Sequence, residues 1–322
     1  MVAPTAVPRG AATTMSEPLI EGIAGRNRRT MQQFLNVALN GLSQGAIYAA
    51  FALALVLIWR STRIINFAQG SMGMFTTYIA LALIESGRSY WVGFAVALLA
   101  GLLLGALVER LVIRRVEGGP ELNAVIVTLG LFVALQALAA ILFGATYRSF
   151  PAPFGLHGFD VGGVNIALTP FNLFAIGAVV VVMLALVALF RFTDVGLRMR
   201  ASAFNQEVSR LLGVPVGRML TLGWALAAMV GSLSGLLIAG GSLVFPAYMD
   251  AVIVYGFVAA VLGGLDSPVG AVVGGLVMGM TLSVVSGYLG SELVALAALA
   301  ILVTVLLVRP RGLFSRTAVR QV

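Results

Sequence analysis

Few residues in this sequence could carry covalent or metal chemistry. The chain has no cysteine and one histidine, His157, which lies in a loop rich in glycine and proline. A lone loop histidine is far more often solvated than a ligand, so we expect no metal site. The sequence also contains no lysine, and the phosphate-binding loop of a P-loop ATPase needs that side chain. We therefore expect neither an enzyme nor a chain that holds a cofactor of its own.

Amides inside apolar segments are the more informative polar residues. Asn36, Asn40, Gln44 and Tyr48 recur every four residues, which places them on one face of a helix. An amide surrounded by hydrocarbon costs free energy unless it has a partner. This face therefore looks either into a helix bundle, where it makes interhelical hydrogen bonds, or into a wet pathway.

A second group of amides breaks the start of the next apolar segment, in the run Asn66-Phe67-Ala68-Gln69-Gly70. Broken helices at membrane depth are typical of transport routes, because unwound backbone is tolerated only where it lines protein or water. The alternative is a helix terminus capped by Asn66 and packed through Gly70. The candidate residues of a translocation pathway are Asn40, Gln44, Tyr48, Asn66, Phe67, Gln69 and Gly70.

The elements that must position these residues are membrane-spanning helices. Of 322 residues, 60% are hydrophobic and only 10% are charged, too apolar a composition for a soluble domain. Apolar segments long enough to cross a bilayer, and without the alternation of a barrel, indicate a helical bundle. They fall at 35–58, 64–85, 91–113, 123–145, 171–190, 219–243, 251–264, 268–289 and 291–308. We expect an all-α polytopic membrane bundle of eight or nine spans, in which the segment at 251–264 is short or broken.

Glycine pairs at four-residue spacing lie inside several of these segments. Such small-xxx-small faces let helix backbones approach closely in lipid, so they predict tight helix packing within a dense bundle. The pairs are Gly41 and Gly45, Gly101 and Gly105, Gly231 and Gly235, Gly270 and Gly274, and Gly275 and Gly279.

The net charge of +8 comes from arginines placed between the apolar segments. If the loop 191–218 lies in the cytoplasm, the alternating direction of successive spans also places Arg60, Arg63, Arg110, Arg114 and Arg115 in the cytoplasm. This placement agrees with the positive-inside rule. We therefore expect these arginines to lie near membrane lipid and not to bind nucleic acid.

The amino terminus conflicts with that orientation. If the chain crosses the membrane nine times and ends in the cytoplasm, its amino terminus lies on the outer side. The positive-inside rule predicts the arginines of residues 1–33 on the cytoplasmic side instead. We interpret residues 1–33 as a disordered leader, and we propose that its first thirty residues are not translated because Met31, rather than Met1 or Met15, is the initiator.

The loop supplies a candidate for energy coupling. Residues 198–215 have apolar positions at helical spacing and end at a glycine, which predicts one short amphipathic helix. It lies on the membrane surface or docks into a protein groove. Since no span carries an ionisable residue at its middle, a transporter of this kind would take its energy from another subunit.

Four stretches together carry a resemblance to a known family. They are LNGLSQGAIYAAFALALVLI, INFAQGSMGMF, RASAFNQEVSRLLGVPVGRM, and GGLDSPVGAVVGGLVMG with the tail LLVRPRGLFSR. In this order they resemble the permease subunits of bacterial ABC importers for branched-chain amino acids and related amides. The chain looks like the shorter of the two permeases that pair in such a system.

The resemblance implies a permease in the bacterial inner membrane that imports branched-chain amino acids. Its implied partners are a second permease, two cytoplasmic ATPases that bind ATP and magnesium, and a periplasmic or lipid-anchored substrate-binding protein. A permease for urea or short amides, and a stand-alone secondary transporter, remain alternatives. The implied organisation is one permease domain at 34–316, with a coupling loop at 191–218 and a cytoplasmic tail at 317–322.

Individual residues follow from the same resemblance. The residues that fall on the ATPase-coupling helix are Arg200, Ala203, Asn205, Glu207, Leu212 and Gly213. The sequence departs from the family at Gln69, where histidine is common, and at Gly217, where an acidic residue is common. Gln69 removes a titratable group from that position.

Overall fold

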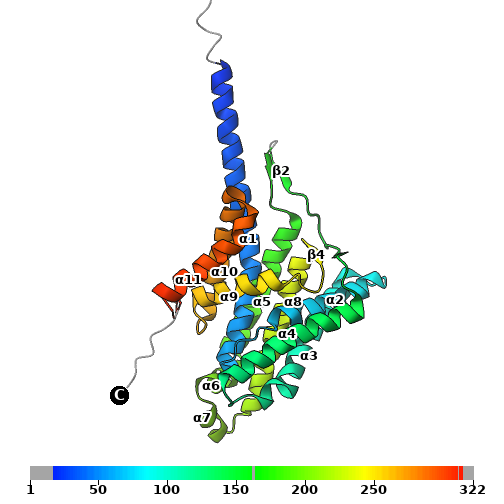
Figure 1. Cartoon of the computed structure of the whole chain (residues 1–322), viewed down its shortest axis with the longest axis vertical. Coiled ribbons are helices and arrows are strands. Elements are labelled where there is room, and N and C mark those ends of the chain that lie inside the picture. The colour runs from blue at the N-terminus through cyan, green and yellow to red at the C-terminus, as the bar shows by residue number, and fades with distance from the viewer. Residues whose placement is uncertain (1–16, 162–163, 311, 315–322) are drawn as a thin grey trace, which may run out of the picture.

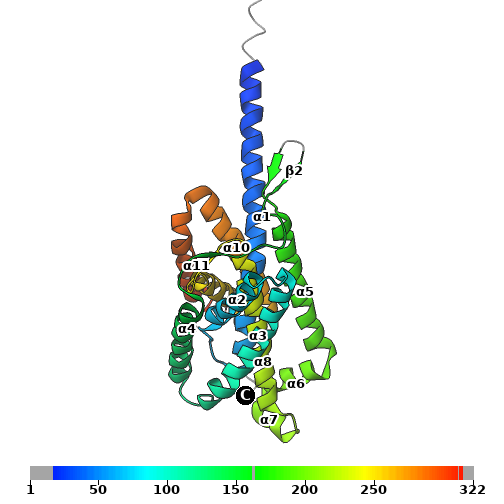
Figure 2. The same ribbon diagram turned by 90° about the vertical axis from the view of Figure 1, so that its right-hand side faces the viewer.

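The computed structural model describes residues 17–161, 164–310 and 312–314, and these form a helical bundle (Figures 1 and 2). The membrane-type helices are α1 (Glu17–Thr62), α2 (Gln69–Glu85), α3 (Tyr90–Leu111), α4 (Glu121–Phe143), α5 (Pro170–Phe192), α8 (Val216–Ala239), α9 (Asp250–Gly263), α10 (Pro268–Val284) and α11 (Val294–Val308). Two short helices, α6 (Asp194–Phe204) and α7 (Gln206–Leu211), follow α5. The predicted all-α membrane bundle is confirmed.

Short elements join the helices. A 3₁₀ turn at Ile113–Arg115 follows α3, a π-helical turn at Val285–Leu289 extends α10, and a second 3₁₀ turn at Ser291–Leu293 precedes α11. Strand β1 (Arg148–Ser149) pairs antiparallel with β4 (Leu243–Val244), and β2 (Phe159–Val161) pairs antiparallel with β3 (Val164–Ile166). These strands tie together the connections at the end of the bundle away from α7 (Figure 1).

The nine apolar segments of the sequence correspond to nine helices of unequal length. Within the described residues, seven helices are long and apolar enough to cross a membrane. The remaining two are α2, with 17 residues, and α9, with 14. Because 14 residues rise only about 21 Å, α9 is the short element that the sequence predicts at 251–264.

The first helix corrects the predicted amino-terminal boundary. It begins at Glu17, so residues 17–33 are helical and not the disordered leader expected for them; residues 1–16 lie outside the described residues. With 46 residues the helix is about 69 Å long, more than twice the thickness of a bilayer's hydrocarbon core. Its first turns project beyond the other helices, at the end opposite α6 and α7 (Figures 1 and 2).

Helices α1 and α8 form the centre of the bundle. The most apolar windows of these two helices are 89% and 78% buried, compared with 17% for α4, 17% for α5 and 11% for α11. The outer helices therefore present their aliphatic side chains to the surroundings, as helices that face lipid must.

The paired glycines lie where helices cross most closely, as predicted. A methyl group on Gly279 would approach the backbone of Gly45 to 2.2 Å, so α1 and α10 meet nearly backbone to backbone. A methyl group on Gly105 would lie 2.4 Å from the carbonyl oxygen of Trp224, which fixes the approach of α3 to α8. Since lipid provides no hydrophobic drive between helices, this close van der Waals contact is what holds the bundle together.

Candidate translocation face and coupling loop

The amide group at the start of α2 is buried and internally satisfied. Asn66 is 1% exposed and Gln69 is 0% exposed. The Asn66 Oδ1 accepts from the backbone N–H of Ala68 at 3.0 Å, and its Nδ2 donates to Gln69 Oε1 at 3.1 Å. Gln69 Nε2 in turn donates to the carbonyl oxygen of Ala227 on α8 at 2.8 Å. These bonds close the break before α2 and join it to the central helix.

Glycines make room for this amide group. A methyl group on Gly231 would lie 2.2 Å from Gln69 Nε2, and one on Gly70 would lie 2.2 Å from Ile253 of α9. Gly70 is therefore packed against α9, as predicted by the interpretation of this run as a packed helix terminus. Phe67 is half-buried, with its ring 6.3 Å from that of Phe257. Asn66, Gln69 and Gly70 are thus buried against neighbouring helices, and the role of this group in translocation stays a prediction.

The amide face of α1 has a different environment. Asn40 and Gln44 are exposed, and neither has a hydrogen-bond partner among the described residues. One turn before them, Asn36 Oδ1 accepts from the backbone N–H of Ala167, after β3, at 2.8 Å. One turn after them, Tyr48 is buried, with its ring edge-on to Tyr255 of α9 at 5.7 Å. Two free amides thus remain on a helix that otherwise crosses the bundle's centre.

A buried carboxylate network supports the opposite end of the molecule. Glu109 of α3 is fully buried and accepts two bonds from Arg114, at 3.1 Å and 3.0 Å. It also accepts from the hydroxyl of Thr221 on α8 at 2.6 Å. Arg114 Nη2 reaches the carbonyl oxygen of Gly217 at 2.8 Å. A buried charge that is paired and hydrogen-bonded in this way fixes the start of α8 relative to α3.

Glu109 lies near the end of the span predicted at 91–113, and its role emerges only from the structure. The signal was present, because an acidic residue followed five positions later by arginine stands where an apolar segment ends. Its partner Thr221 lies 112 positions further along the chain, and no local pattern indicates that bond. Gly217 contributes its backbone carbonyl to the same network.

Glu117 extends this polar region towards α7. Burial raises the pKa of its carboxyl group above the usual range, while a hydrogen bond with Gln206 of α7 acts in the opposite direction. The nearby carboxylate of Glu109 also raises this pKa, and the guanidinium groups of Arg114 and Arg210 lower it. The connection between α3 and α4 therefore touches the helix that follows the loop's break.

The predicted single helix at 198–215 is wrong, because it breaks into α6 and α7 at Asn205. This residue has an extended backbone, and its side chain accepts from the N–H of Val208 at 3.0 Å as the N-cap of α7. At the other end Gly213 takes a φ of +77°, and the N–H of Val214 bonds to the carbonyl oxygen of Ser209 at 2.9 Å. That pattern is a Schellman motif, which explains the need for glycine.

The α6–α7 tip is an exposed apolar surface, which we define as Phe204, Val208, Leu211 and Leu212. Phe204 is 93% exposed, Leu211 is 88% exposed and Leu212 is 77% exposed. Asn205, Glu207 and Gly213 are exposed along α7 and at its two ends, Arg200 is exposed on α6, and Ala203 is half-buried. Glu207 is not ion-paired with any described residue. A capped helix pair that exposes large apolar side chains is typical of a docking surface.

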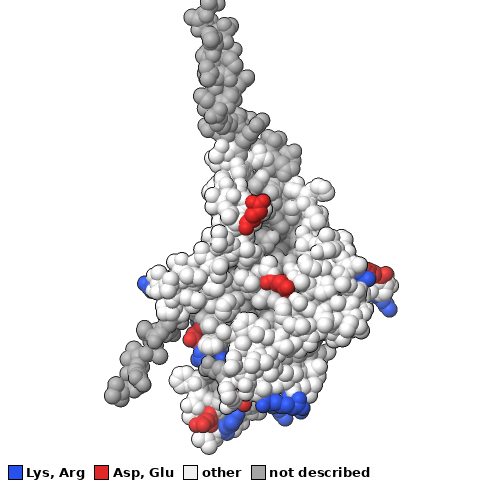
Figure 3. Space-filling view, in the orientation of Figure 1, with Lys and Arg blue, Asp and Glu red and all other residues white. Residues whose placement is uncertain are grey.

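Arginines collect at the end of the molecule that carries this tip. Figure 3 shows a band of positive side chains there, below α3 and α6. The contacts agree, because Arg114 reaches Gly217 and Arg63 pairs with Asp266 after α9. Arg148 instead pairs with Glu85, at the end of α2, near the β1–β4 strands. The grouping of arginines predicted from the sequence is thus a feature of the fold.

Comparison with known proteins assigns the chain to a family. Residues 37–308 match the family described as branched-chain amino acid transport system, permease component. The high-affinity branched-chain amino acid transport permease LivH of Salmonella typhimurium is 28% identical over 301 residues, covering 90% of this chain and 98% of LivH. BraD, the corresponding permease of Pseudomonas aeruginosa, is 25% identical over 303 residues, covering 90% and 98%.

A third relative matches in the same way. The probable branched-chain amino acid transport permease LivH of Methanocaldococcus jannaschii is 28% identical over 286 residues, covering 81% of this chain and 86% of that protein. The match spans the amide face of α1, the buried amides before α2, the α6–α7 tip and α11. This chain therefore belongs to the permease component family of branched-chain amino acid transport systems.

Proposed function

We propose that the chain is one of two permease subunits of an ABC importer that moves branched-chain amino acids across the bacterial inner membrane. Separate ATPase subunits supply the energy, and a binding protein outside the membrane delivers the substrate. The observation that carries the proposal is the exposed α6–α7 tip, which is anchored to the bundle but has no partner surface of its own within the described residues.

The tip is suited to receive force from an ATPase. Asn205 and Gly213 fix both ends of α7 through backbone geometry, so a push on the tip is not absorbed by fraying of that helix. Gln206 contacts Glu117, and Arg114 connects the start of α8 with α3. Because α6 follows α5 in the chain and α8 follows α7, movement of the tip would shift α5, α6 and α8 together, which is the motion that opens a pathway alternately to each side.

The orientation follows from the arginines. The end that carries Arg114, Arg200 and the tip lies in the cytoplasm, where the ATPases are, because cytoplasmic loops are enriched in positive residues. The opposite end, with the β-strands, then faces the binding protein.

The exposed amides of α1 are the best candidates for the pathway. Asn40 and Gln44 lie within the 33-residue apolar span Thr30–Thr62 and would be costly if they faced lipid. A pathway shared with a second permease would hydrate them or give them partners. We therefore propose that this face, with Tyr48 at its inner end, lines the route between the two permeases.

The coupling role is tested by uptake of labelled leucine into proteoliposomes that contain the complete importer. Glu207→Lys reverses the charge beside the tip, and Gly213→Ala forces a non-glycine residue to a φ of +77°, which costs about 1–2 kcal/mol. Both variants should insert normally but lose most ATP-dependent uptake. The matched control is Glu292→Lys, an exposed acidic residue between α10 and α11, which should keep it. Unchanged uptake by both loop variants would refute the coupling role.

The same vesicles separate the remaining functions. Uptake by this chain alone, without ATPases, would identify a secondary carrier in place of an ABC importer. Retention of urea or a short amide by the complete importer, with no retention of leucine, isoleucine or valine, would assign the other substrate class.

A further inference from the structure

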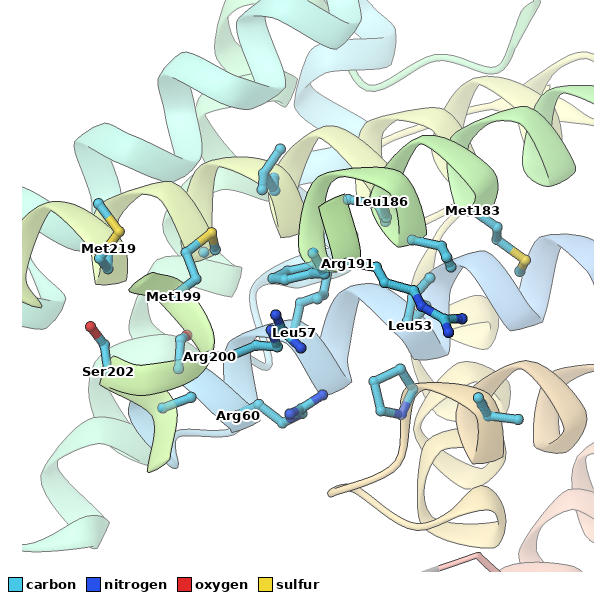
Figure 4. Close-up of a pocket in the computed structure, with 18 of the residues that line it drawn as sticks. Leu53, Leu57, Arg60, Met183, Leu186, Arg191, Met199, Arg200, Ser202 and Met219 are labelled. Atoms are coloured by element: carbon cyan, nitrogen blue, oxygen red, sulfur yellow. The ribbon is translucent and has the colours of Figure 1, made fainter. Parts of the chain in front are cut away.

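A cavity of about 390 Å³ lies beside the coupling loop (Figure 4). Leu53 and Leu57 of α1 form one wall, Leu186 of α5 and Met219 of α8 form others, and the start of α10 closes the far side at Pro268. The lining is mostly aliphatic and sulfur-containing, so the interior favours a hydrocarbon chain. Because α5 is among the least buried helices of the bundle, the cavity lies beside a helix that faces lipid.

Three arginines from three helices surround the same cavity. Arg60 comes from the last turn of α1, Arg191 from the last turn of α5 and Arg200 from α6, and Figure 4 shows all three among its lining side chains. Among the described residues, none of the three forms an ion pair. Asp266 attracts Arg60 electrostatically, but it pairs with Arg63 and does not line the cavity.

The combination of an apolar lining and three arginines decides which class of molecule fits the cavity. An amino acid zwitterion brings an ammonium group, and no acidic side chain among the described residues lines the cavity to receive it. An anion attached to an apolar chain meets both requirements, because guanidinium groups bind phosphate oxygens in a forked geometry while the chain occupies the aliphatic interior. The arginines also lie at the end of the bundle that is proposed to be cytoplasmic, at the depth where lipid headgroups sit.

We infer that this cavity binds an anionic phospholipid of the inner leaflet, with its phosphate on Arg60, Arg191 and Arg200 and one acyl chain against Leu53, Leu57 and Leu186. The placement in the inner leaflet rests on the proposed orientation, whereas the binding itself does not depend on transport. A lipid in this position bridges α1, α5 and α6, and so it holds the coupling loop against the bundle.

Native mass spectrometry of the full purified chain tests the inference. The probes are phosphatidylglycerol, phosphatidylethanolamine, inorganic phosphate and leucine. We expect saturable binding of one phosphatidylglycerol, markedly weaker binding of phosphatidylethanolamine, and no retention of phosphate or leucine. The Arg60→Gln/Arg191→Gln variant should bind phosphatidylglycerol about 25-fold more weakly, since each arginine near an anionic lipid surface is worth about a factor of five.

Two further variants separate binding from folding. Arg110→Gln removes an exposed arginine at the same end of the bundle that does not line the cavity, and it should bind phosphatidylglycerol normally. Val187→Trp fills the cavity from the exposed face of α5 without a change of charge, and it should also weaken binding. This second variant keeps the test valid if the double arginine variant does not fold.

Several results would overturn the inference. Equal binding of both phospholipids would show that charge is not recognised. Retention of inorganic phosphate alone would show an anion site without a lipid. Binding of leucine that the same variants abolish would make the cavity part of the substrate route. Normal phosphatidylglycerol binding by both the double arginine variant and Val187→Trp would place the lipid elsewhere.

Discussion

The two groups of amides that interrupt the apolar sequence lie in opposite environments. Asn66 and Gln69 are buried, bonded to each other and to the backbone, and packed against glycines of α8 and α9. Asn40 and Gln44 are exposed on α1 and have no partner among the described residues. The first group stabilises the bundle, and the second is available to substrate, water or another subunit. The same residue type in the same apolar setting is therefore hydrogen-bonded inside the bundle in one place and left without a partner among the described residues in the other.

The largest effect is expected from Asn66→Leu. The backbone N–H of Ala68 and the Oε1 of Gln69 would both lose their partners inside the bundle. Each buried group left unsatisfied costs about 1–3 kcal/mol, so the free energy of unfolding should fall by about 3 kcal/mol. Thermal melting of the purified chain and the yield of monodisperse protein measure this loss. A variant that melts like the wild type but does not transport would show that Asn66 acts in translocation and not in stability.

Gly231→Ala should have the next largest effect. The added methyl group would lie 2.2 Å from Gln69 Nε2 and push that side chain away from Ala227. Overpacking of this kind costs about 1–3 kcal/mol, to be read from the same melting curves. The matched control is Gly130→Ala on α4, where a methyl group meets nothing within 4 Å. That variant should be neutral or stabilising by about 0.5–1 kcal/mol, and equal losses at both positions would contradict close packing at Gly231.

Asn40→Leu and Gln44→Leu should affect transport and leave stability nearly unchanged. Their side chains are exposed, so the free energy of unfolding should change by less than about 0.5 kcal/mol. Uptake per molecule of complete importer should fall about fivefold or more, as expected when a hydrogen bond worth about 1 kcal/mol is lost. Asn40→Gln should retain more activity than Asn40→Leu. Normal uptake in both leucine variants would remove this face from the pathway.

Glu117→Gln should give the smallest effect, because Glu117 is only half-buried and solvent screens its charge. Its Oε1 is buried without a hydrogen-bond partner among the described residues, while the side chain as a whole is half-buried. Burial raises the pKa of Glu117 above its ordinary value of 4.5, so the folded chain binds the proton more tightly than the unfolded chain. The stability of the wild type should therefore fall as pH rises from 4.5 through the raised range.

The glutamine variant should lack this contribution. It should gain stability relative to the wild type as pH rises, by about 0.5 kcal/mol or less because solvent screens a half-exposed group. Melting temperatures of both proteins at pH 5 and pH 8 measure the difference. A relative loss of stability at pH 8 would show that ion pairing, and not burial, dominates at Glu117.

Much of the fold could be predicted because its signals are local. The length of each apolar segment predicted the membrane helices, including the short α9, and glycine spacing predicted the close approach of α1 to α10. The break at Asn205 was also encoded locally, since asparagine is a strong N-cap. It was missed because the apolar spacing from Ala201 to Leu211 continues across the break and favours one helix. The extension of α1 back to Glu17 was missed because polar composition indicated disorder.

The sequence by itself determined that this chain is a membrane bundle, with its arginines between the spans and its small residues at the helix crossings. Hydrophobicity and helical periodicity are properties of consecutive residues, so they can be recognised without knowing which helices pack against each other. Only the tertiary structure decided which amides are satisfied, that Thr221 completes the site of Glu109, and that three arginines meet around one cavity. Those outcomes depend on which helix faces which, because a hydrogen bond or a charge cluster forms between residues far apart in the chain.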